Sequence, residues 1–375
     1  MSKSSSKVLV VDGMFPNKYS SWRNYEIIAL IEKFGADVFV YKGTPWAGID
    51  FQIDYEFIAH LVDLSDYKFI IFDSAYNYLQ SFNKDFDGTK FNGDYPGSYL
   101  LTKSNDFDLE EYNVIYHIFL GTITRFNQDF EVRRPKQVCH LYPGGGFGFK
   151  SIEKLSDEYT YVSTHPLTSE KCAADRVKFI EAFVTPQSGT NEVVRVKPRG
   201  KDREFTVCFS SLGYMKEKGA RKYVAMGILY KMFFPWHKIR FLAIGNCYKL
   251  FPIKVLEPMD FKALENFYFN EVDIQVNLMS KVATNGWPLG IEAVKQGVVL
   301  ITTDPNQVSK RYIYGENIQI SERIWDFILR IRKMYLDREE LLSWQEKGLV
   351  FFNYHCSFDQ QQGRVIQLIE EITNT

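Results

Sequence analysis

The stretch NGWPLGIEAVKQGVVLITTD, Asn285–Asp304, decides the fold. It consists of a loop with Gly286, a helix that opens near Pro288 and stops at Gly297, and a buried apolar strand. Proline suits a first helical turn, because the amide proton that it lacks has no intrahelical acceptor there. A helix that leads directly into a continuous apolar strand is typical of an α/β chain with parallel strands.

The start of this helix is suited to an anionic ligand. Its exposed amides and the positive end of its dipole converge near Pro288, and together they can hold a diphosphate. Glu292 lies one turn into the helix, within reach of a ligand that covers the helix start. Because a carboxylate repels phosphate, this position suits hydroxyl groups such as those of a ribose.

The rest of the chain alternates strands and helices in the same way. The amino half predicts a βαβ unit in which the strands Lys7–Gly13 and ADVFVY flank a helix that stops at Gly35. Gly13, at the end of the first strand, permits a close approach of the backbone to a ligand. Further strands are expected at 67–73, 113–119, 136–142, 158–163, 205–211, 239–245, 272–279 and 298–304.

Two series of parallel strands in 375 residues predict two domains. We place a Rossmann-like domain at 1–185, an apolar-poor linker at 186–204 and a second Rossmann-like domain at 205–355. The last residues, 356–375, contain a helix that can pack back on the amino-terminal domain. The polar and aromatic stretch between Asp73 and Asn113 is expected to be an irregular insertion. Ligands of such sheets bind at the carboxyl ends of the strands, so a cleft between facing domains is the expected site.

Composition excludes several functional classes. Hydrophobic residues make up 45% and charged residues 24% of the chain, as in folded globular proteins. Lys and Arg number 45 against 46 Asp and Glu, a balance that argues against nucleic acid as a partner. The five cysteines are scattered, which favours reduced thiols. Neither a secretory signal nor an apolar run of roughly 18 residues is visible, so we expect a cytoplasmic protein.

Two stretches of the carboxyl half resemble the donor-site segments of retaining glycosyltransferases with the GT-B fold, particularly those of glycosyltransferase family 4. In the stretch quoted above, the resemblance rests on Ile291-Glu292-Ala293, the Gly297 stop and Thr302-Thr303-Asp304. Upstream, FSSLGYMKEKGARKYVAM contains Glu217-Lys218-Gly219 before a helix, and FLAIGN ends an apolar strand with glycine. The resemblance covers residues 205–305 and extends to the amino half in outline. It implies an α/β, GT-B architecture of two facing Rossmann-like domains.

The resemblance also implies roles for individual residues. Lys218 would stabilise the diphosphate leaving group, whose charge grows as the glycosidic bond breaks. His140, at the end of the strand KQVCHLY, would line the sugar pocket and, with Glu292, belong to the catalytic residues. The other implied contacts are Gly213, Trp287, Pro288 and Leu289 at the diphosphate, Asn285 and Gly286 with Glu292 at the ribose and sugar, and Gly13 in the cleft.

The implied activity is that of a hexosyl- or related glycosyltransferase. It would move a sugar, with retention of configuration, from a UDP- or GDP-sugar to a hydroxyl group of a glycan, a lipid-linked saccharide or a protein glycan, as in polysaccharide biosynthesis. The nucleotide-sugar is a substrate, and the resemblance implies neither a cofactor nor a metal. Asp85-Phe86-Asp87 and Asp106-Phe107-Asp108 mimic the metal-binding Asp-x-Asp of the other glycosyltransferase fold. Both lie in polar insertion sequence, and we interpret them as chance matches.

Alternatives remain open. Asn285 stands near the place of a family glutamate that contacts the donor sugar, and Gly213 or a neighbour replaces an arginine. A non-catalytic relative that binds a glycan or nucleotide is therefore one rival, and a nucleotide-sugar epimerase of the same fold is another. The stretch Leu229–Arg240 also has two interpretations, a peripheral membrane contact or the end of a core helix followed by a strand. We favour the second.

Overall fold

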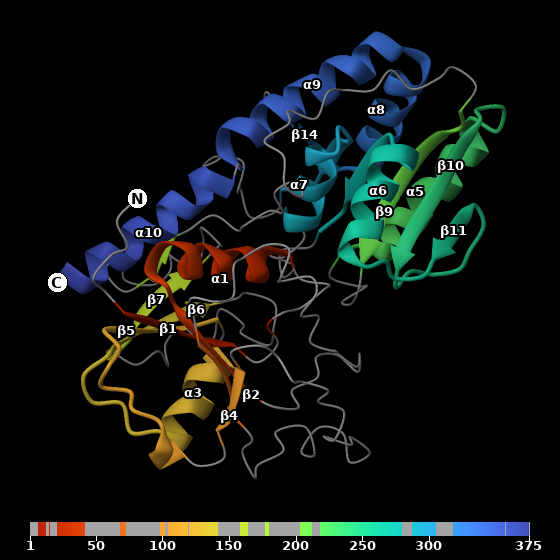
Figure 1. The fold of residues 1–375 in the computed structure, drawn as a ribbon. Coiled ribbons are helices and arrows are strands. Elements are labelled where there is room, and N and C mark those ends of the chain that lie inside the picture. The colour runs from red at the N-terminus through yellow and green to blue at the C-terminus, as the bar shows by residue number, and fades with distance from the viewer. Residues whose placement is uncertain are drawn as a thin grey trace. The chain divides into compact units, whose positions relative to one another are not determined.

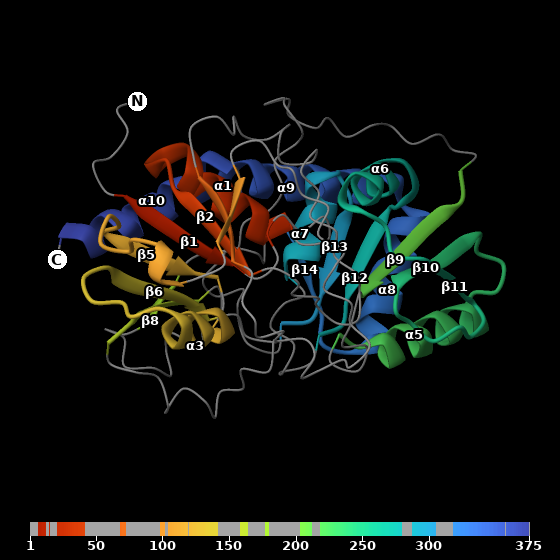
Figure 2. The ribbon, with the colours of Figure 1, turned by 60° about the horizontal axis from the view of Figure 1, so that its bottom comes forward.

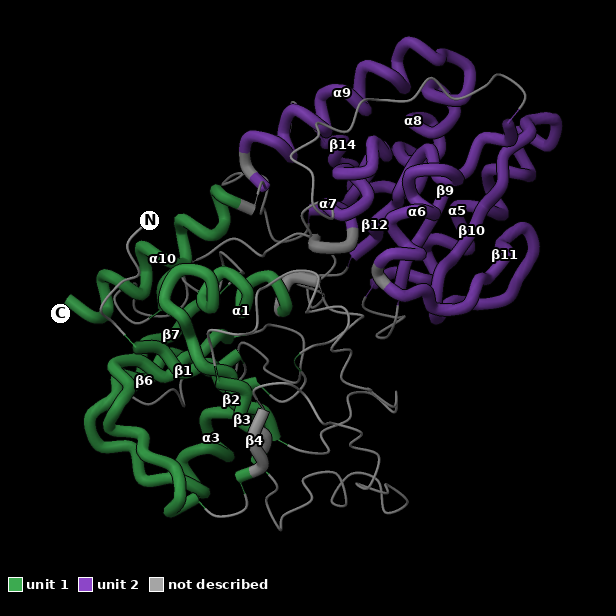
Figure 3. Tube along the Cα trace, in the orientation of Figure 1, with its two compact units in different colours: residues 1–183, 358–375 green, residues 184–357 purple. Residues whose placement is uncertain are grey.

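A computed structural model divides the chain into two compact units (Figure 3). One unit consists of residues 1–183 with 358–375, and the other of residues 184–357. The described residues are 7–12, 15, 21–41, 68–72, 98–101, 104–118, 120–141, 158–163, 177–179, 203–211, 218–279, 287–304, 318–356 and 358–374. Most of the linker expected at 186–204 lies outside them.

The first unit contains one parallel sheet with helices on both faces (Figures 1 and 2). Its strands are β1 (Val8–Asp12), β2 (Asp37–Tyr41), β3 (Phe69–Phe72), β4 (Ser98–Leu101), β5 (Val114–His117), β6 (Lys136–Leu141), β7 (Thr160–Ser163) and β8 (Val177–Phe179). Its helices are α1 (Ser21–Phe34), α3 (Leu120–Asp129) and α10 (Phe358–Asn374), with a 3-10 turn at Ser104–Asp106. The described strands follow the order β4-β3-β2-β1-β5-β6-β7-β8, and each neighbouring pair is parallel.

The two faces of this sheet have different neighbours. α3 covers one face, where an aromatic cluster forms around Phe39 and Phe126, whose rings meet edge to face at 5.3 Å. α1 covers the other face and lies beside α10, where Gln362 donates a 2.8 Å hydrogen bond to Glu32 (Figure 1). α1 ends at Gly35, as predicted, because φ of +62° there is a left-handed conformation that favours glycine.

Four short strands were not predicted from the sequence. Ser98–Leu101 forms β4 at one edge of the first sheet and Val177–Phe179 forms β8 at the other. The interpretation of residues 74–112 as wholly irregular is therefore wrong for β4. In the second unit, Ile253–Leu256 forms the edge strand β11 and Gln319–Ile320 forms the opposite edge strand β14. Edge strands are short and need little apolar surface, so their sequences lack the long apolar runs of central strands.

The second unit has the same architecture. Its strands are β9 (Phe205–Ser211), β10 (Ile239–Gly245), β11, β12 (Ile274–Asn277), β13 (Val299–Thr302) and β14 (Gln319–Ile320). Its helices are α5 (Ala220–Phe233), α6 (Phe261–Glu271), α7 (Trp287–Lys295), α8 (Ile324–Leu336) and α9 (Arg338–His355). The described strands follow the order β11-β10-β9-β12-β13-β14, again with parallel neighbours.

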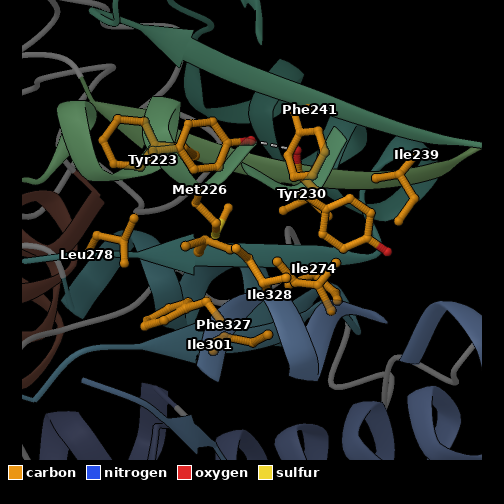
Figure 4. Close-up of a cluster of buried hydrophobic side chains, with 14 of the residues drawn as sticks. Tyr223, Met226, Tyr230, Ile239, Phe241, Ile274, Leu278, Ile301, Phe327 and Ile328 are labelled. Carbon is orange, nitrogen blue, oxygen red and sulfur yellow. Dashed lines mark hydrogen bonds between the residues drawn. The ribbon is translucent and has the colours of Figure 1, made fainter. Parts of the chain in front are cut away.

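Alternate residues of the central strands face different helices. Val207 and Phe209 belong to the core under α5 and α8, whereas Cys208 belongs to the core under α6 and α7 (Figures 2 and 4). Tyr223 of α5 stacks on Phe209 with ring centroids 5.0 Å apart, and its hydroxyl lies 2.9 and 2.8 Å from two strand carbonyl oxygens. Burial of both strand faces explains the continuous apolar runs in the sequence. None of the helices in the described ranges has the length and apolar character to cross a membrane.

Replacing Phe126 with alanine is expected to destabilise the first unit by about 3–5 kcal/mol, because the change leaves a cavity where the ring stacks on Phe130 at 4.7 Å. Urea denaturation followed by circular dichroism measures the loss. Gln128→Ala, at an exposed position of the same helix, is the matched control and should change the unfolding free energy by less than about 0.5 kcal/mol. Equal stability of the two variants would contradict the cluster's role.

Candidate active site

The carboxyl ends of β9 and β12 form the switch point of the second sheet. Strand order reverses there, because β9 continues to β10 on one side and β12 to β13 on the other. The chain leaves β9 at Ser211 and leads to α5, and it leaves β12 at Asn277 and leads to α7. Both helices therefore begin at this edge, where doubly wound sheets bind their ligands.

Lys218 is held at this edge by the glycine that follows it. Gly219 has a φ of +82°, a conformation that L side chains rarely adopt. A Cβ at this position would lie 2.1 Å from the carbonyl oxygen of Leu278, directly after β12. The backbone before α5 thus lies against the end of β12, and only glycine permits this approach.

The ammonium group of Lys218 is surrounded by protein atoms. Burial lowers its pKa from the ordinary value of 10.5 to about 8, and the nearby carboxylate of Glu292 partly opposes this shift. A group with such a perturbed pKa at a strand-end switch point is a candidate for a functional role.

α7 packs closely on the sheet next to Lys218. A Cβ at Gly290 would lie 2.6 Å from Nδ2 of Asn277 and 2.9 Å from Cδ2 of Leu300. The sequence analysis assigned no role to Gly290, although a glycine inside a helix is a known sign of close packing. The helix begins at Trp287, so Pro288 is in its first turn as expected.

Glu292, in the second turn of α7, lies among groups of opposite charge. Its negative charge acts on Lys218 and also on Lys295. Burial lowers the pKa of Lys295, and the carboxylate of Glu265, whose Oε1 lies 2.6 Å from the Lys295 Nζ, partly opposes this shift. Burial, with a smaller contribution from Glu292, raises the pKa of Tyr268. Glu292 itself is buried.

Several of the expected site residues cannot be placed. Gly13, Gly213, Asn285 and Gly286 lie outside the described residues. For Trp287, Pro288 and Leu289, the structure describes the helical backbone alone. Lys218 and Glu292 are therefore the two predicted donor-site residues whose side chains can be compared, and their charges interact in the structure.

His140 belongs to a buried polar network of the first unit. Its Nδ1 lies 3.0 and 3.1 Å from the two carboxylate oxygens of Glu26 in α1, and the Tyr116 hydroxyl donates to the same carboxylate. His140 is fully buried, and these contacts give it a structural role. Its predicted role at the sugar remains a prediction.

His117 is neutral near pH 7. It lies in β5 on the opposite face of the sheet, where its ring meets Phe126 at 5.3 Å and its Nε2 lies 2.9 Å from Gln137. Burial lowers its pKa to about 3. In the part of the chain that the structure describes, no three His, Cys, Asp or Glu side chains group as metal ligands would.

No family model and no curated protein matches the sequence. The fold, in contrast, matches solved structures over nearly the whole chain. HepE of Anabaena, in complex with UDP and glucose, gives a TM-score of 0.67 at 11% identity, over 97% of this chain and 99% of that chain. The trehalose-6-phosphate synthase of E. coli, bound with UDP-2-fluoro glucose, gives 0.65 at 11% identity, over 99% of each chain. Sucrose-phosphate synthase from Thermosynechococcus elongatus gives 0.59 at 11% identity, over 98% of this chain and 99% of that chain.

These similarities show that the chain has the GT-B fold. The predicted α/β class, with parallel sheets in two Rossmann-like units, is confirmed. Identities near 11% carry the comparison no further than the fold.

Replacing Lys218 with methionine is expected to stabilise the protein at neutral pH. The pKa is about 8 in the folded chain and 10.5 when solvated, and this lowering already includes the attraction of Glu292. At about 1.4 kcal/mol per pH unit, the buried charge costs up to about 3 kcal/mol below pH 8. Between pH 8 and 10.5 the folded protein releases the proton first, so the stability of the wild type rises toward that of the variant.

Urea denaturation at neutral pH and near pH 10.5 measures this difference. Lys262→Met, at an exposed lysine of α6, is the matched control and should show no such pH dependence. A Lys218→Met protein less stable than the wild type at neutral pH would show that the lysine is not desolvated.

Proposed function

We propose that the protein is a glycosyltransferase that moves a sugar from a nucleotide-sugar to a hydroxyl acceptor. One observation carries the proposal: Lys218, whose ammonium group is desolvated, interacts electrostatically with Glu292 at the switch point of the second unit. Structures of similar fold contain UDP with glucose, UDP-glucose or UDP-2-fluoro glucose. These ligands support a nucleotide-sugar as the donor.

The diphosphate would bind between Lys218 and the start of α7. The helix start contributes amide donors and a positive dipole end, and Lys218 contributes a full positive charge. When the bond between sugar and diphosphate breaks, negative charge develops on the leaving oxygen. A cation held in a desolvated setting stabilises that charge more in the transition state than in the ground state. The protein would thus supply by itself the charge that a metal ion supplies elsewhere.

Glu292 would bind hydroxyl groups of the donor. Its position in the second turn of α7 is one turn beyond the amides that would hold the diphosphate. A carboxylate accepts hydrogen bonds from two hydroxyls, as a ribose offers. Its negative charge acts on two lysines, Lys218 and Lys295.

The remaining assignments rest on the family resemblance. They are retention of configuration, the roles of Gly213 and Trp287–Leu289 at the diphosphate, those of Asn285 and Gly286 at the sugar, and those of His140 and Gly13 in the first unit. The acceptor class, a glycan, a lipid-linked saccharide or a protein glycan, has the same basis.

Calorimetry with UDP, GDP and UDP-glucose, together with assays of UDP release from UDP-glucose, tests the proposal. We expect at least one nucleotide to bind, and Lys218→Met to weaken its binding about 10- to 100-fold, because a charge-assisted contact is lost. Glu292→Gln should weaken binding less and reduce turnover. Lys262→Met should match the wild type in both measurements.

The outcomes separate the candidate functions. Nucleotide binding that depends on Lys218, with UDP release, supports the transferase. Binding that depends on Lys218 without turnover of any donor would support a non-catalytic relative. Interconversion of the nucleotide-sugar to its epimer, with no sugar transferred, would support an epimerase. If no nucleotide binds, or if Lys218→Met and Glu292→Gln both behave as the wild type, the donor-site assignment is wrong.

A further inference from the structure

A surface of the second unit that takes no part in the proposed donor site is exposed and apolar. α5 and α8 pack side by side on one face of the sheet, and their inner sides form the core shown in Figure 4. Their outer sides and the turn after α5 expose large apolar side chains. We call the following six residues the apolar face: Met232, Phe233, Trp236, Trp325, Leu329 and Leu336.

These residues form a surface that core packing does not require. Met232 and Trp236 are 69% and 71% exposed, so neither contributes much to the interior. Phe233 and Trp325 join the two helices on the outside, with ring centroids 5.0 Å apart in an edge-to-face arrangement. α8 buries Phe327, Ile328, Ile331 and Met334 on its other side. Its outward Trp and Leu residues are therefore additional to those that hold it on the sheet.

The surroundings of the apolar face are basic. Residues 229–238 contain two cationic side chains and no acidic one, and residues 322–337 contain four cationic and three acidic side chains. These segments therefore carry an excess of three positive charges, in a chain whose net charge is -1. The cationic residues are Lys231, Lys238, Arg323, Arg330, Arg332 and Lys333, of which Lys333 pairs with Glu340 at 2.7 Å.

We infer that the apolar face binds the surface of an anionic lipid bilayer. Trp, Phe, Leu and Met enter the boundary between headgroups and acyl chains, and lysine and arginine around them attract acidic headgroups. A second copy of the chain is a poorer partner. A symmetric dimer through this face would bring the same positive surface against itself, with unfavourable repulsion.

The apolar face and the donor site lie at opposite ends of α5. This helix begins after Gly219 at the carboxyl edge of the sheet and runs 14 residues to Phe233, a length of about 20 Å. The chain then reverses and enters β10 at Ile239. The favoured interpretation of Leu229–Arg240, a helix end followed by a strand, is confirmed, and its outward side chains remain available for a membrane. Substitutions at Met232 and Trp236 should therefore leave Lys218 and Glu292 undisturbed.

Vesicle flotation with the full-length protein tests the inference. One set of vesicles contains phosphatidylcholine with about 30% phosphatidylglycerol, and the other contains phosphatidylcholine alone. The test variants are Met232→Ser/Trp236→Ser, which removes apolar side chains, and Lys238→Glu/Arg323→Glu, which reverses two charges at exposed residues beside the apolar face. The matched controls are Val350→Ser, at an exposed apolar residue of α9, and Lys262→Glu, at an exposed lysine of α6. Thermal denaturation confirms that each variant is folded.

We expect the wild type and both controls to float with the anionic vesicles at low ionic strength, and to bind neutral vesicles at least tenfold more weakly. Each double variant should lose at least tenfold in affinity for anionic vesicles, and salt should weaken the binding of the wild type.

Failure of the wild type to bind anionic vesicles, or binding by the double variants equal to that of the wild type, would overturn the inference. So would a stable wild-type dimer that Met232→Ser/Trp236→Ser dissociates, because the face would then be an interface between copies. Nucleotide binding is measured separately, so failure here leaves the proposed donor site untouched.

Discussion

The proposed donor site depends on the burial of one positive charge, the ammonium group of Lys218 at the switch point of the second sheet. Lys218 is kept there by a left-handed glycine whose missing side chain lets the backbone lie against Leu278. Burial lowers the pKa of the lysine to about 8, and Glu292 offsets part of that shift. Buried charge pairs add little to stability. We propose that this pair, at a strand-end edge and on tightly packed glycine backbone, forms a preorganised anion site.

The polar interiors of the two units differ in what they offer a ligand. In the first unit, Glu26 joins Tyr116 and His140 in a network whose members hydrogen-bond to one another. In the second unit, Lys295 forms an ion pair with Glu265. The charge of Glu292 acts on both Lys218 and Lys295. We propose that the positive charge of Lys218 stabilises the negative charge of a bound diphosphate. Glu292 would then bind hydroxyl groups of the donor.

The sequence predicts the central strands well, and for a physical reason. Parallel strands buried on both faces, such as Val8–Asp12 and Phe205–Ser211, are continuous apolar runs. Lys218-Gly219 and Glu292 lie in motifs whose spacing carries the family resemblance. The strand Ser98–Leu101 was missed because it is a short edge strand inside a polar stretch. The hydrogen-bond partner of His140 was not visible in the sequence, since Glu26 lies 114 positions away and only the tertiary fold brings the two together.

The pKa of Lys218, followed by NMR of isotope-labelled lysine with and without saturating UDP, tests the central claim most directly. The account predicts a value near 8 in the free protein, and a rise to the ordinary 10.5 or above when the diphosphate binds. Lys218→Met identifies the signal, and calorimetry establishes saturation. A free-protein pKa already near 10.5, or a value that stays near 8 with UDP bound, would contradict the claim that this cation receives the diphosphate.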